Sequence, residues 1–499
     1  MALPNEKLAS SLKLLKQAQD EDGLVVSAKK LSRVHLNRLL EHGYLKRVIA
    51  GWYYPARPGE GKGDTTSWYA SRMEFVRSYA DLRFGKDWYV SPEISLLIHT
   101  GATVLPKQIQ LHAKQAKNNS LPLPAGSSLF DYASPKIMGP EDRCEAGKVR
   151  ALTLEAALVL ISPQMWISDP MTMEVALGQL KDATEILKVL ANGGHSIIAG
   201  RIAGALIATG RAALAYEIVE FMTSLGYKVA FTNPFSEPPR QFIRQESPYC
   251  ARIRIMWNEM RKDILEVWDK PVVPILNSEA VLKDAHERYL EDAYNSLSIE
   301  GYKVSLELIE RIAGGEKASK TDDNAMAAKG YFDAHKKVEE SIVKIINGAS
   351  PGSVIKADLK GWNQSLWAPR VQAGILKPSD LLGWRGHDVF IIGSQHTPLN
   401  PSAVRDAMPT FFELLLNEEA PAVRAVLGHF VFVFIHPYMD GNGRLGRFLM
   451  NAMLASGGWP WTVVPVSMKK NYMAALEDAS SKQDIKPFAK FICGLIPTH

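Results

Sequence analysis

The feature that most constrains this chain is the stretch His436–Arg447, whose sequence is HPYMDGNGRLGR. Apolar segments at 427–435 and 445–455 flank it, so this polar cluster is expected to lie between two buried elements. The proline after the histidine disfavours a continuous helix, and the glycines allow a turn from which a second helix begins. Arg444 and Arg447 would share one face of that helix, whose first N–H groups form an anion site. The stretch therefore predicts a phosphate site with a histidine at its mouth.

Length and composition indicate a soluble protein with several domains. A chain of 499 residues predicts two to four domains. A hydrophobic fraction of 46% and a charged fraction of 22% are those of globular proteins. The net charge of +5 is small for this length, so it permits nucleic-acid or nucleotide binding without requiring it.

Cysteine usage and hydropathy point to a cytoplasmic protein. Cys144, Cys250 and Cys493 lie far apart in the sequence, so neither a disulfide framework nor a metal spacing is expected, which suits a reducing compartment. The first residues lack the apolar core of a secretory signal. No run reaches the roughly 20 apolar residues of a membrane helix.

Residues 1–60 are predicted to form a winged helix-turn-helix. Helical spacing covers 6–18, and short helices are expected at 28–32 and 34–41. Residues 44–54 alternate around Gly51, as in a β-hairpin. The helix at 34–41 would read DNA and the hairpin would be the wing.

Basic side chains on this region favour phosphate contacts, although a small protein-interaction module with a solvated basic face is the alternative. The predicted DNA-binding residues are Lys29, Lys30, Arg33, Arg38, Lys46 and Arg47. The pattern DGLVVSAKKL…HLNRLLEHGYLKRVIAGWYYP resembles the N-terminal winged helix of AbiEi-type antitoxins and transcriptional regulators.

Residues 66–250 are predicted to form a mixed α/β domain without a chemical constellation. Helices are expected at 66–82, 91–100, 152–161, 171–191, 197–208 and 211–225, and strands near 107–112, 128–137 and 227–232. The isolated histidines His99, His112 and His195 are interpreted as structural. The stretch VSPEISLLIHTGATVLPKQIQLHA also resembles AbiEi proteins, which implies a regulator's companion domain.

The rest of the chain is predicted to be an all-α bundle. A connector helix is assigned to 251–270 and the bundle to 271–499, with a Pro/Gly-punctuated stretch at 348–387. Residues 387–397 alternate around Gly393 and predict a β-hairpin. The fold class is thus multidomain: a winged helix-turn-helix, a mixed α/β domain and a helical bundle with a hairpin flap.

The opening stretch resembles the Fic family signature, His-x-Phe-x-Asp/Glu-Gly-Asn-Gly-Arg-x-x-Arg. Seven of its eight specified positions match in one frame, which makes a chance metal pair or solvated loop a poor explanation. Tyr438 replaces the usual Phe, and a buried hydroxyl at that position needs a hydrogen-bond partner. The resemblance covers roughly 270–499, including LLGWRGHDVFIIGSQHTPLNP as the flap region and NYMAALEDASSKQD as the nucleotide-side helix.

This resemblance implies transfer of AMP from ATP to a Tyr, Ser or Thr hydroxyl, with release of pyrophosphate. His436 would be the general base, and Asp440 would hold Mg²⁺. The backbone of Gly441, Asn442 and Gly443 would cradle phosphate oxygens, and Arg444 and Arg447 would hold the β- and γ-phosphates. The flap would pair with an extended target segment, and its docking residues are Val389, Phe390, Ile391 and Ile392.

A second pattern suggests self-inhibition. Ser296-Leu-Ser-Ile-Glu300-Gly301 resembles the family's inhibitory motif, Ser/Thr-x-x-x-Glu-Gly/Asn, on a helix expected at about 281–301. Glu300 would pair with Arg447 and skew ATP into an unproductive pose. The alternative is an ordinary helix end with a solvated Glu300 and Gly301 as its stop signal.

Other functions stay open. An AbiEi-like regulator, of the kind found in toxin–antitoxin systems, would use the Fic region for nucleotide sensing or self-modification and would bind its own promoter. Some relatives of this family remove AMP with the inhibitory glutamate, and others transfer UMP, phosphate or phosphocholine. The partners considered are a target protein or the chain itself, DNA and a second copy of the chain, with no membrane partner.

Overall fold

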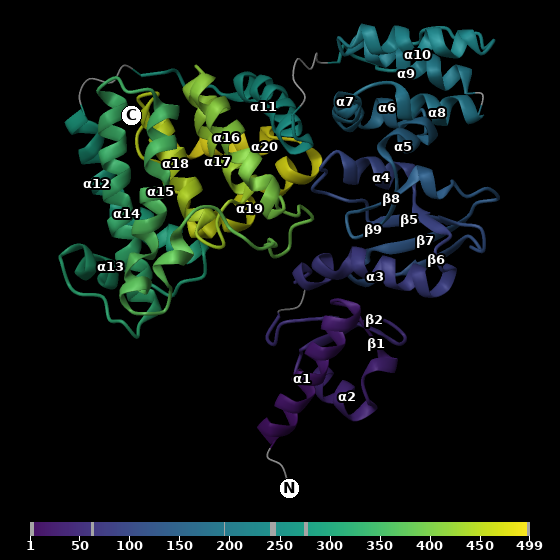
Figure 1. Ribbon diagram of the computed structural model, residues 1–499. Coiled ribbons are helices and arrows are strands. Elements are labelled where there is room, and N and C mark those ends of the chain that lie inside the picture. The colour runs from purple at the N-terminus through teal and green to yellow at the C-terminus, as the bar shows by residue number, and fades with distance from the viewer. Residues whose placement is uncertain (1–3, 61–63, 194, 240–245, 274–277, 497–499) are drawn as a thin grey trace. The chain divides into compact units, whose positions relative to one another are not determined.

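A computed structural model describes residues 4–60, 64–193, 195–239, 246–273 and 278–496. The chain divides into two compact units (Figure 1). The N-terminal unit is Met1–Pro248 together with Phe390–Thr397. The C-terminal unit is Tyr249–Val389 together with Pro398–His499.

The N-terminal unit begins with helices around a small sheet. Its elements are α1 (Pro4–Asp22), β1 (Val26–Ser27), the 3₁₀ turn η1 (Ala28–Lys30), α2 (Arg33–Glu41), β2 (Leu45–Ile49) and β3 (Trp52–Pro55). The strands are antiparallel in the order β1-β3-β2, and Gly51 turns the β2–β3 hairpin at φ +79°. Apolar side chains at helical and alternating spacing meet in one small core, which contains Leu15, Val26, Leu31, Leu36, Leu39 and Leu45.

A four-stranded sheet follows. Its elements are α3 (Thr66–Phe84), β4 (Trp88–Val90), α4 (Pro92–His99), β5 (Gln108–Ala113), β6 (Asn119–Pro122) and β7 (Ser128–Ala133). The strand order is β4-β5-β7-β6, and only the β5–β7 pairing is parallel. A separate hairpin joins β8 (Arg143–Ala146) to β9 (Val149–Leu152). His99 donates to the Leu152 carbonyl at 2.7 Å, which is a structural role.

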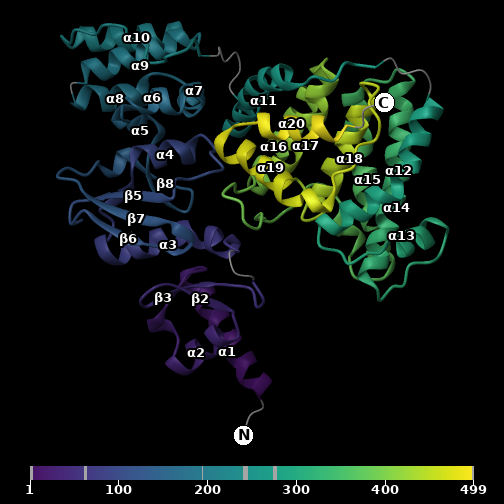
Figure 2. The same cartoon turned by 180° about the vertical axis from the view of Figure 1, so that it is seen from behind.

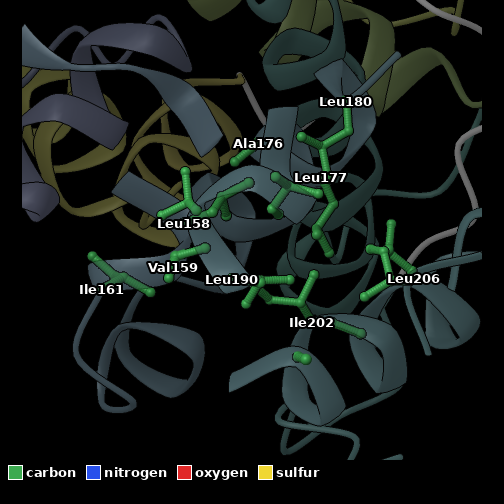
Figure 3. Close-up of a cluster of buried hydrophobic side chains, with 14 of the residues drawn as sticks. Leu158, Val159, Ile161, Ala176, Leu177, Leu180, Leu190, Ile202 and Leu206 are labelled. Atoms are coloured by element: carbon green, nitrogen blue, oxygen red, sulfur yellow. The ribbon is translucent and has the colours of Figure 1, made fainter. Parts of the chain in front are cut away.

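A helical layer completes this unit (Figure 3). Its helices are α5 (Leu154–Leu160), α6 (Met165–Ser168), α7 (Pro170–Gln179), α8 (Thr184–Gly193), α9 (Ser196–Ala208) and α10 (Ala212–Ser224). Leu158, Leu177, Leu190, Ile202 and Leu206 belong to its core.

Two predictions in this layer are wrong. The helix expected at 171–191 is two helices, because the chain is extended at Leu180 and Asp182 accepts a hydrogen bond from the Thr184 N–H at 2.8 Å. The strand expected at 227–232 forms no ladder. That segment instead crosses α9, where the Thr232 N–H donates to the Gly200 carbonyl at 3.0 Å.

The C-terminal unit is helical (Figure 2). Its helices are α11 (Pro248–Val267), α12 (Ser278–Ile299), α13 (Leu306–Ala313), α14 (Asp323–Ile346), α15 (Pro351–Gln372), α16 (Pro401–Asn417), α17 (Pro421–Ile435), α18 (Asn442–Ala455), α19 (Lys469–Lys482) and α20 (Lys486–Leu495), with 3₁₀ turns η4 (Pro378–Leu381) and η5 (Val466–Met468). Thirteen of the fifteen residues of α17 are buried. In the part of the chain that the structure describes, no helix combines the length and hydropathy needed to cross a bilayer.

Most of the punctuated stretch 348–387 is the long helix α15. Pro351 occupies its first turn, where a missing N–H costs nothing. Gly352 serves close packing instead of breaking the helix, because an added Cβ would lie 2.5 Å from the Leu416 Cα. Glycine and proline thus mark helix packing here, and composition alone does not separate that role from a loop.

A pair of glycines tests the packing of α14 on α15. A Cβ on Gly330 would lie 2.1 Å from the Leu366 carbonyl oxygen, whereas a Cβ on Gly361 would meet nothing within 4 Å. Gly330→Ala should lower the free energy of unfolding by about 1–3 kcal/mol or more, because two backbones must separate. Gly361→Ala, the control within the same helix pair, should raise it by roughly 0.5–1 kcal/mol. Urea denaturation checks both values, and equal effects of the two changes would contradict this account.

Candidate functional site

His436 lies at the C-terminal end of buried α17 in the left-handed region, at φ +55°. Its N–H donates to the Phe432 carbonyl at 3.0 Å. Its Nδ1 lies 3.1 Å from the Val433 carbonyl oxygen, which can only accept a hydrogen bond, so Nδ1 carries the proton. Nε2 is therefore left with its lone pair. Burial lowers the pKa of His436, although the bond to Val433 opposes the shift, so the imidazole is neutral near pH 7.

Arg385, which the sequence patterns did not single out, holds this loop. Its Nε donates to the His436 carbonyl at 2.7 Å, and its own N–H donates to the Pro437 carbonyl at 2.9 Å. Its Nη1 donates to the His387 carbonyl at 2.7 Å, and its Nη2 donates to the Leu399 carbonyl. One buried guanidinium thus joins the histidine loop to both ends of the segment predicted as a flap. Only the fold shows this role.

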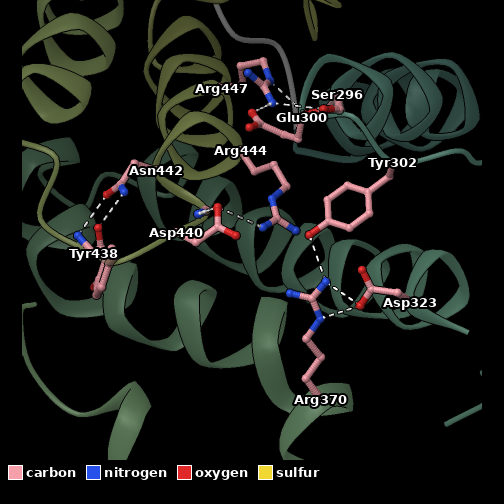
Figure 4. Close-up of polar contacts among 11 residues, drawn as sticks. Ser296, Glu300, Tyr302, Asp323, Arg370, Tyr438, Asp440, Asn442, Arg444 and Arg447 are labelled. Carbon is pink, nitrogen blue, oxygen red and sulfur yellow. Dashed lines mark hydrogen bonds and ion pairs between the residues drawn. The ribbon is translucent and has the colours of Figure 1, made fainter. Parts of the chain in front are cut away.

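The turn after His436 is closed by reciprocal hydrogen bonds. The Tyr438 N–H donates to the Asn442 Oδ1 at 3.0 Å, and the Asn442 Nδ2 donates to the Tyr438 carbonyl at 2.9 Å (Figure 4). The Tyr438 ring is buried against Trp384, with centroids 5.3 Å apart. Its hydroxyl has no hydrogen-bond partner among the described residues, so the expectation of one is wrong. The ring's apolar contacts are what hold it in the core.

The glycines of the motif shape the start of α18. Gly441 precedes the helix at φ +85°, a conformation that strains other residues. A Cβ on Gly443 would lie 2.4 Å from the Glu300 Oε1. The Asp440 side chain is 63% exposed, and its Oδ1 lies 4.0 Å from the Arg444 Nη2. The helix start therefore offers N–H groups and an exposed carboxylate side by side.

Arg447 reaches back from α18 to the end of α12. Its Nη2 donates to the Glu300 Oε1 at 2.6 Å, and its Nε donates to the Ser296 Oγ at 2.8 Å (Figure 4). The Arg447 side chain is only 2% exposed. Burial by itself would raise the pKa of Glu300, but attraction to Arg447 and then to Arg444 outweighs it, so that pKa lies below its ordinary value. The pair is ionised at neutral pH.

The end of α12 has the geometry of a helix stop. Gly301 adopts φ +95°, its N–H donates to the Ser298 carbonyl at 3.1 Å, and the Tyr302 N–H donates to the Leu297 carbonyl at 3.1 Å. This bonding pattern is a Schellman motif. The helix ends at Ile299, so the range predicted for it, about 281–301, includes this turn. Gly301 is thus a helix stop, as the alternative interpretation has it, and Glu300 keeps a side-chain exposure of 26% while it pairs with Arg447.

Arg444 is buried against two rings that the sequence patterns also missed. Its Cζ lies 4.8 Å from the Trp367 ring centroid and 5.3 Å from that of Tyr302. Trp367 lies on α15 and Tyr302 follows the helix stop of α12, so only the tertiary fold brings them to α18.

The predicted flap hairpin is not formed as paired strands. Residues 388–396 contain no strand, and a single turn bond joins the Ser394 N–H to the Ile391 carbonyl at 3.2 Å. Val389, Phe390 and Ile391 are half-buried, and Ile392 is 71% exposed. An isolated two-stranded hairpin is marginally stable in water, and here no third strand supports it.

The six predicted DNA contacts behave differently from one another. Arg38 bonds within its own domain, to the Lys7 carbonyl at 2.9 Å and the Ser11 Oγ at 2.8 Å. Lys46 pairs with buried Glu60 at 2.5 Å. Since α1 and a buried carboxylate hold these two side chains, they are poor candidates for DNA contacts. Lys30 pairs with Glu21 at the surface, at 3.3 Å. The remaining exposed side chains are Lys29, Arg33 and Arg47.

Comparison with known proteins gives a family match and several relatives. Residues 358–454 match the Fic/DOC family. The protein adenylyltransferase Fic of Nematostella vectensis is 27% identical over 247 residues, covering 48% of this chain and 55% of that protein. That of Drosophila erecta is 31% identical over 226 residues, covering 44% and 42%. The chain spans about half the length of these curated relatives.

Among solved structures, Fic-1 (residues 134–508) from C. elegans is 19% identical with a TM-score of 0.36, covering 68% of this chain and 88% of that chain. The matched residues 358–454 contain His436, Asp440, Arg444 and Arg447. The similarity of this chain to the Fic/DOC family therefore covers the whole motif His436–Arg447.

Proposed function

We propose that the C-terminal unit transfers AMP from ATP to a Tyr, Ser or Thr hydroxyl of a target protein or of the chain itself. The observation that carries this proposal is the neutral His436, with Nε2 free to accept a proton, beside the α18 N-terminus. The adenylyltransferase names of the curated relatives support it.

His436 Nε2 takes the proton of the incoming hydroxyl, and the hydroxyl oxygen attacks the α-phosphorus. The bond between the α-phosphorus and the oxygen that bridges it to the β-phosphate breaks, and pyrophosphate leaves. Gly441, Asn442 and Gly443 supply backbone donors at the α18 N-terminus. Arg444 and Arg447 balance the phosphate charge.

Asp440 suits Mg²⁺. Among the described residues, no three His, Cys, Asp or Glu side chains form a metal site. Mg²⁺ is ordinarily held by one or two carboxylates together with substrate phosphates, so an exposed carboxylate beside a phosphate cradle fits that ion. When bound, the ion would neutralise charge on the α- and β-phosphates.

We also infer that Glu300 inhibits this activity. It occupies Arg447, the arginine assigned to the γ-phosphate, at 2.6 Å. Its carboxylate also covers Gly443 in the phosphate cradle, and an added Cβ there would lie only 2.4 Å from it. An ATP bound in the presence of this pair would lack one cationic partner. Removal of Glu300 frees both the charge and the space.

The segment 388–396 is proposed to dock the target. Its half-buried residues Val389, Phe390 and Ile391 follow Arg385 closely in the sequence. An extended target segment would supply the strand that this segment lacks, so pairing would form on binding.

Labelling with ATP radioactive at the α-phosphate tests the activity and its inhibition. Wild type should label weakly, Glu300→Gly at least about tenfold more strongly because Arg447 is released, and Glu300→Gly/His436→Ala not detectably because the base is lost. Equal strong labelling by wild type and Glu300→Gly would refute inhibition. Labelling by the His436→Ala double variant would refute the base assignment.

The pH dependence of labelling tests the state of His436. Its pKa is lowered, so the free base persists below its ordinary value of about 6.5, and the rate of Glu300→Gly should fall only at lower pH. Glu300 itself raises that pKa, so the acid limb of wild type should lie above that of Glu300→Gly. Because the pKa of Glu300 is also lowered, acidification over this range should not relieve inhibition. An acid limb of Glu300→Gly at or above pH 6.5 would contradict the assignment.

A second candidate function is DNA binding by residues 1–60. The order of helices and the β2–β3 hairpin support the proposal of a winged helix-turn-helix, and Arg33 on α2 and Arg47 on β2 are exposed. We propose that this domain binds the promoter of the chain's own gene and that the Fic region senses nucleotide or modifies the chain. This regulator role is compatible with AMP transfer.

Gel shift at low salt tests DNA binding, since phosphate contacts are strongest there. Arg33→Glu/Arg47→Glu should weaken binding by roughly tenfold or more, because two cationic contacts become repulsive. Lys181→Glu/Lys188→Glu, an equal charge change on the helical layer of the same unit, should leave it nearly unchanged. No shift by wild type, or equal loss in both variants, would refute the proposal.

Removal of AMP from a modified target protein is a third candidate function, and it would use the same site. Glu300 lies near His436 closely enough to raise its pKa and would position a water for attack on an AMP-modified target. Release of AMP from a labelled target by wild type, but not by Glu300→Gly, would favour it.

A further inference from the structure

Arg444 is held in an unusual environment for a cation. Its side chain is 1% exposed, and its guanidinium lies over the rings of Trp367 and Tyr302 at 4.8 and 5.3 Å. Contacts of this kind are strongest when they are desolvated. The two rings replace part of the hydration that Arg444 loses on burial.

Some of the hydrogen-bond donors of Arg444 have no acceptor among the described residues. Its Nε and Nη2 have no hydrogen-bond partner among the described residues, and the Asp440 Oδ1 is 4.0 Å away. A buried donor without an acceptor has lost its hydrogen bonds to water and gained none in exchange, which is unfavourable. A Cβ on Gly441 would lie 3.5 Å from the Arg444 Nη2, so these donors lie beside the start of α18. An anion at that position would satisfy them.

Tyr302 is itself anchored through its hydroxyl. Its hydroxyl accepts a hydrogen bond from the Arg370 Nη2 at 3.2 Å, and Arg370 lies over the rings of Trp367 and Tyr302 at 4.8 and 5.8 Å (Figure 4). Asp323 holds Arg370 at 2.5 Å. Helices α14 and α15 therefore fix the ring on which Arg444 rests.

The same helix stop places Glu300 and Tyr302. The Schellman bonds at Gly301 direct Glu300 to Arg447 and the Tyr302 ring to Arg444. One turn thus contacts both arginines of the motif, through a carboxylate in one case and through an aromatic ring in the other.

We propose that Tyr302 is a positioning residue that, with Trp367, orients Arg444 to bind the β-phosphate of the nucleotide. This inference rests on the proposed function. It predicts that the loss of the ring weakens binding of nucleotides that carry a β-phosphate and spares those that do not. Glu300 occupies Arg447, whereas Tyr302 orients Arg444 for the nucleotide. Loss of Glu300 should therefore strengthen ATP binding, and loss of Tyr302 should weaken it.

Calorimetric binding of ATP, ADP and AMP to the full chain, with Mg²⁺ present, tests this. The parent is Glu300→Gly/His436→Ala, in which inhibition is removed and no turnover occurs. Adding Tyr302→Ala should weaken ATP and ADP binding by about tenfold and change AMP binding by less than about twofold. Tyr302→Phe keeps the ring, so it should stay within about threefold of the parent for ATP.

Two further variants guard against a general folding defect. Trp367→Leu removes the neighbouring ring from another helix and should reproduce the selective loss of ATP and ADP binding. Tyr216→Ala removes an exposed tyrosine from the other unit and should change nothing. A thermal melt of each variant reports its fold, and Trp367→Leu decides the outcome if Tyr302→Ala does not fold.

The outcomes separate this inference from the proposed function. Equal loss of ATP and AMP binding overturns the role of Tyr302 but leaves the proposed function standing. Unchanged ATP binding in both Tyr302→Ala and Trp367→Leu has the same consequence. A parent that binds none of the three nucleotides overturns both the proposed function and this inference. Selective loss of ATP and ADP binding, rescued by Tyr302→Phe, supports it.

Discussion

The buried guanidinium of Arg447 is the constraint on which the site depends. A charge taken out of water costs several kcal/mol unless partners replace its hydration. Here Glu300 supplies the opposite charge and Ser296 supplies acceptors, all from the end of α12. Because α18 carries both Arg447 and the phosphate cradle, the pair also fixes α12 over the cradle. A phosphate group would meet the same demand, so the proposed inhibition and the proposed nucleotide binding would compete at this side chain.

The histidine loop obeys a second constraint, the burial of α17. A non-glycine residue in the left-handed region costs about 1–2 kcal/mol, and it persists only where surrounding contacts determine it. The buried helix before His436 and the Arg385 bonds to the loop carbonyls provide those contacts. The result is an imidazole whose tautomer is set by Val433 before any substrate arrives. Geometry of this kind lowers the reorganisation that a proton transfer requires.

Much of the architecture was predictable because hydrophobic period and turn chemistry act locally. The helices around the motif and the hairpin after α2 follow from spacing of this kind. The predictions failed where packing overrides composition. Gly352 in α15 allows close contact and does not end the helix, and residues 388–396 lack the neighbouring strand that a ladder needs. Arg38 and Lys46 were predicted to contact DNA, but Arg38 donates a hydrogen bond to Ser11 and Lys46 forms an ion pair with Glu60.

The sequence by itself determined that the proposed base, carboxylate, phosphate cradle and arginines stand together, because the motif His436–Arg447 holds all of them in twelve consecutive residues. It also indicated Glu300 as a partner for Arg447. Only the tertiary structure decided how the arginines are held. The rings of Tyr302 and Trp367 and the guanidinium of Arg385 come from segments far from the motif in sequence. Contacts of this kind depend on where helices cross, and no local period or spacing records a crossing.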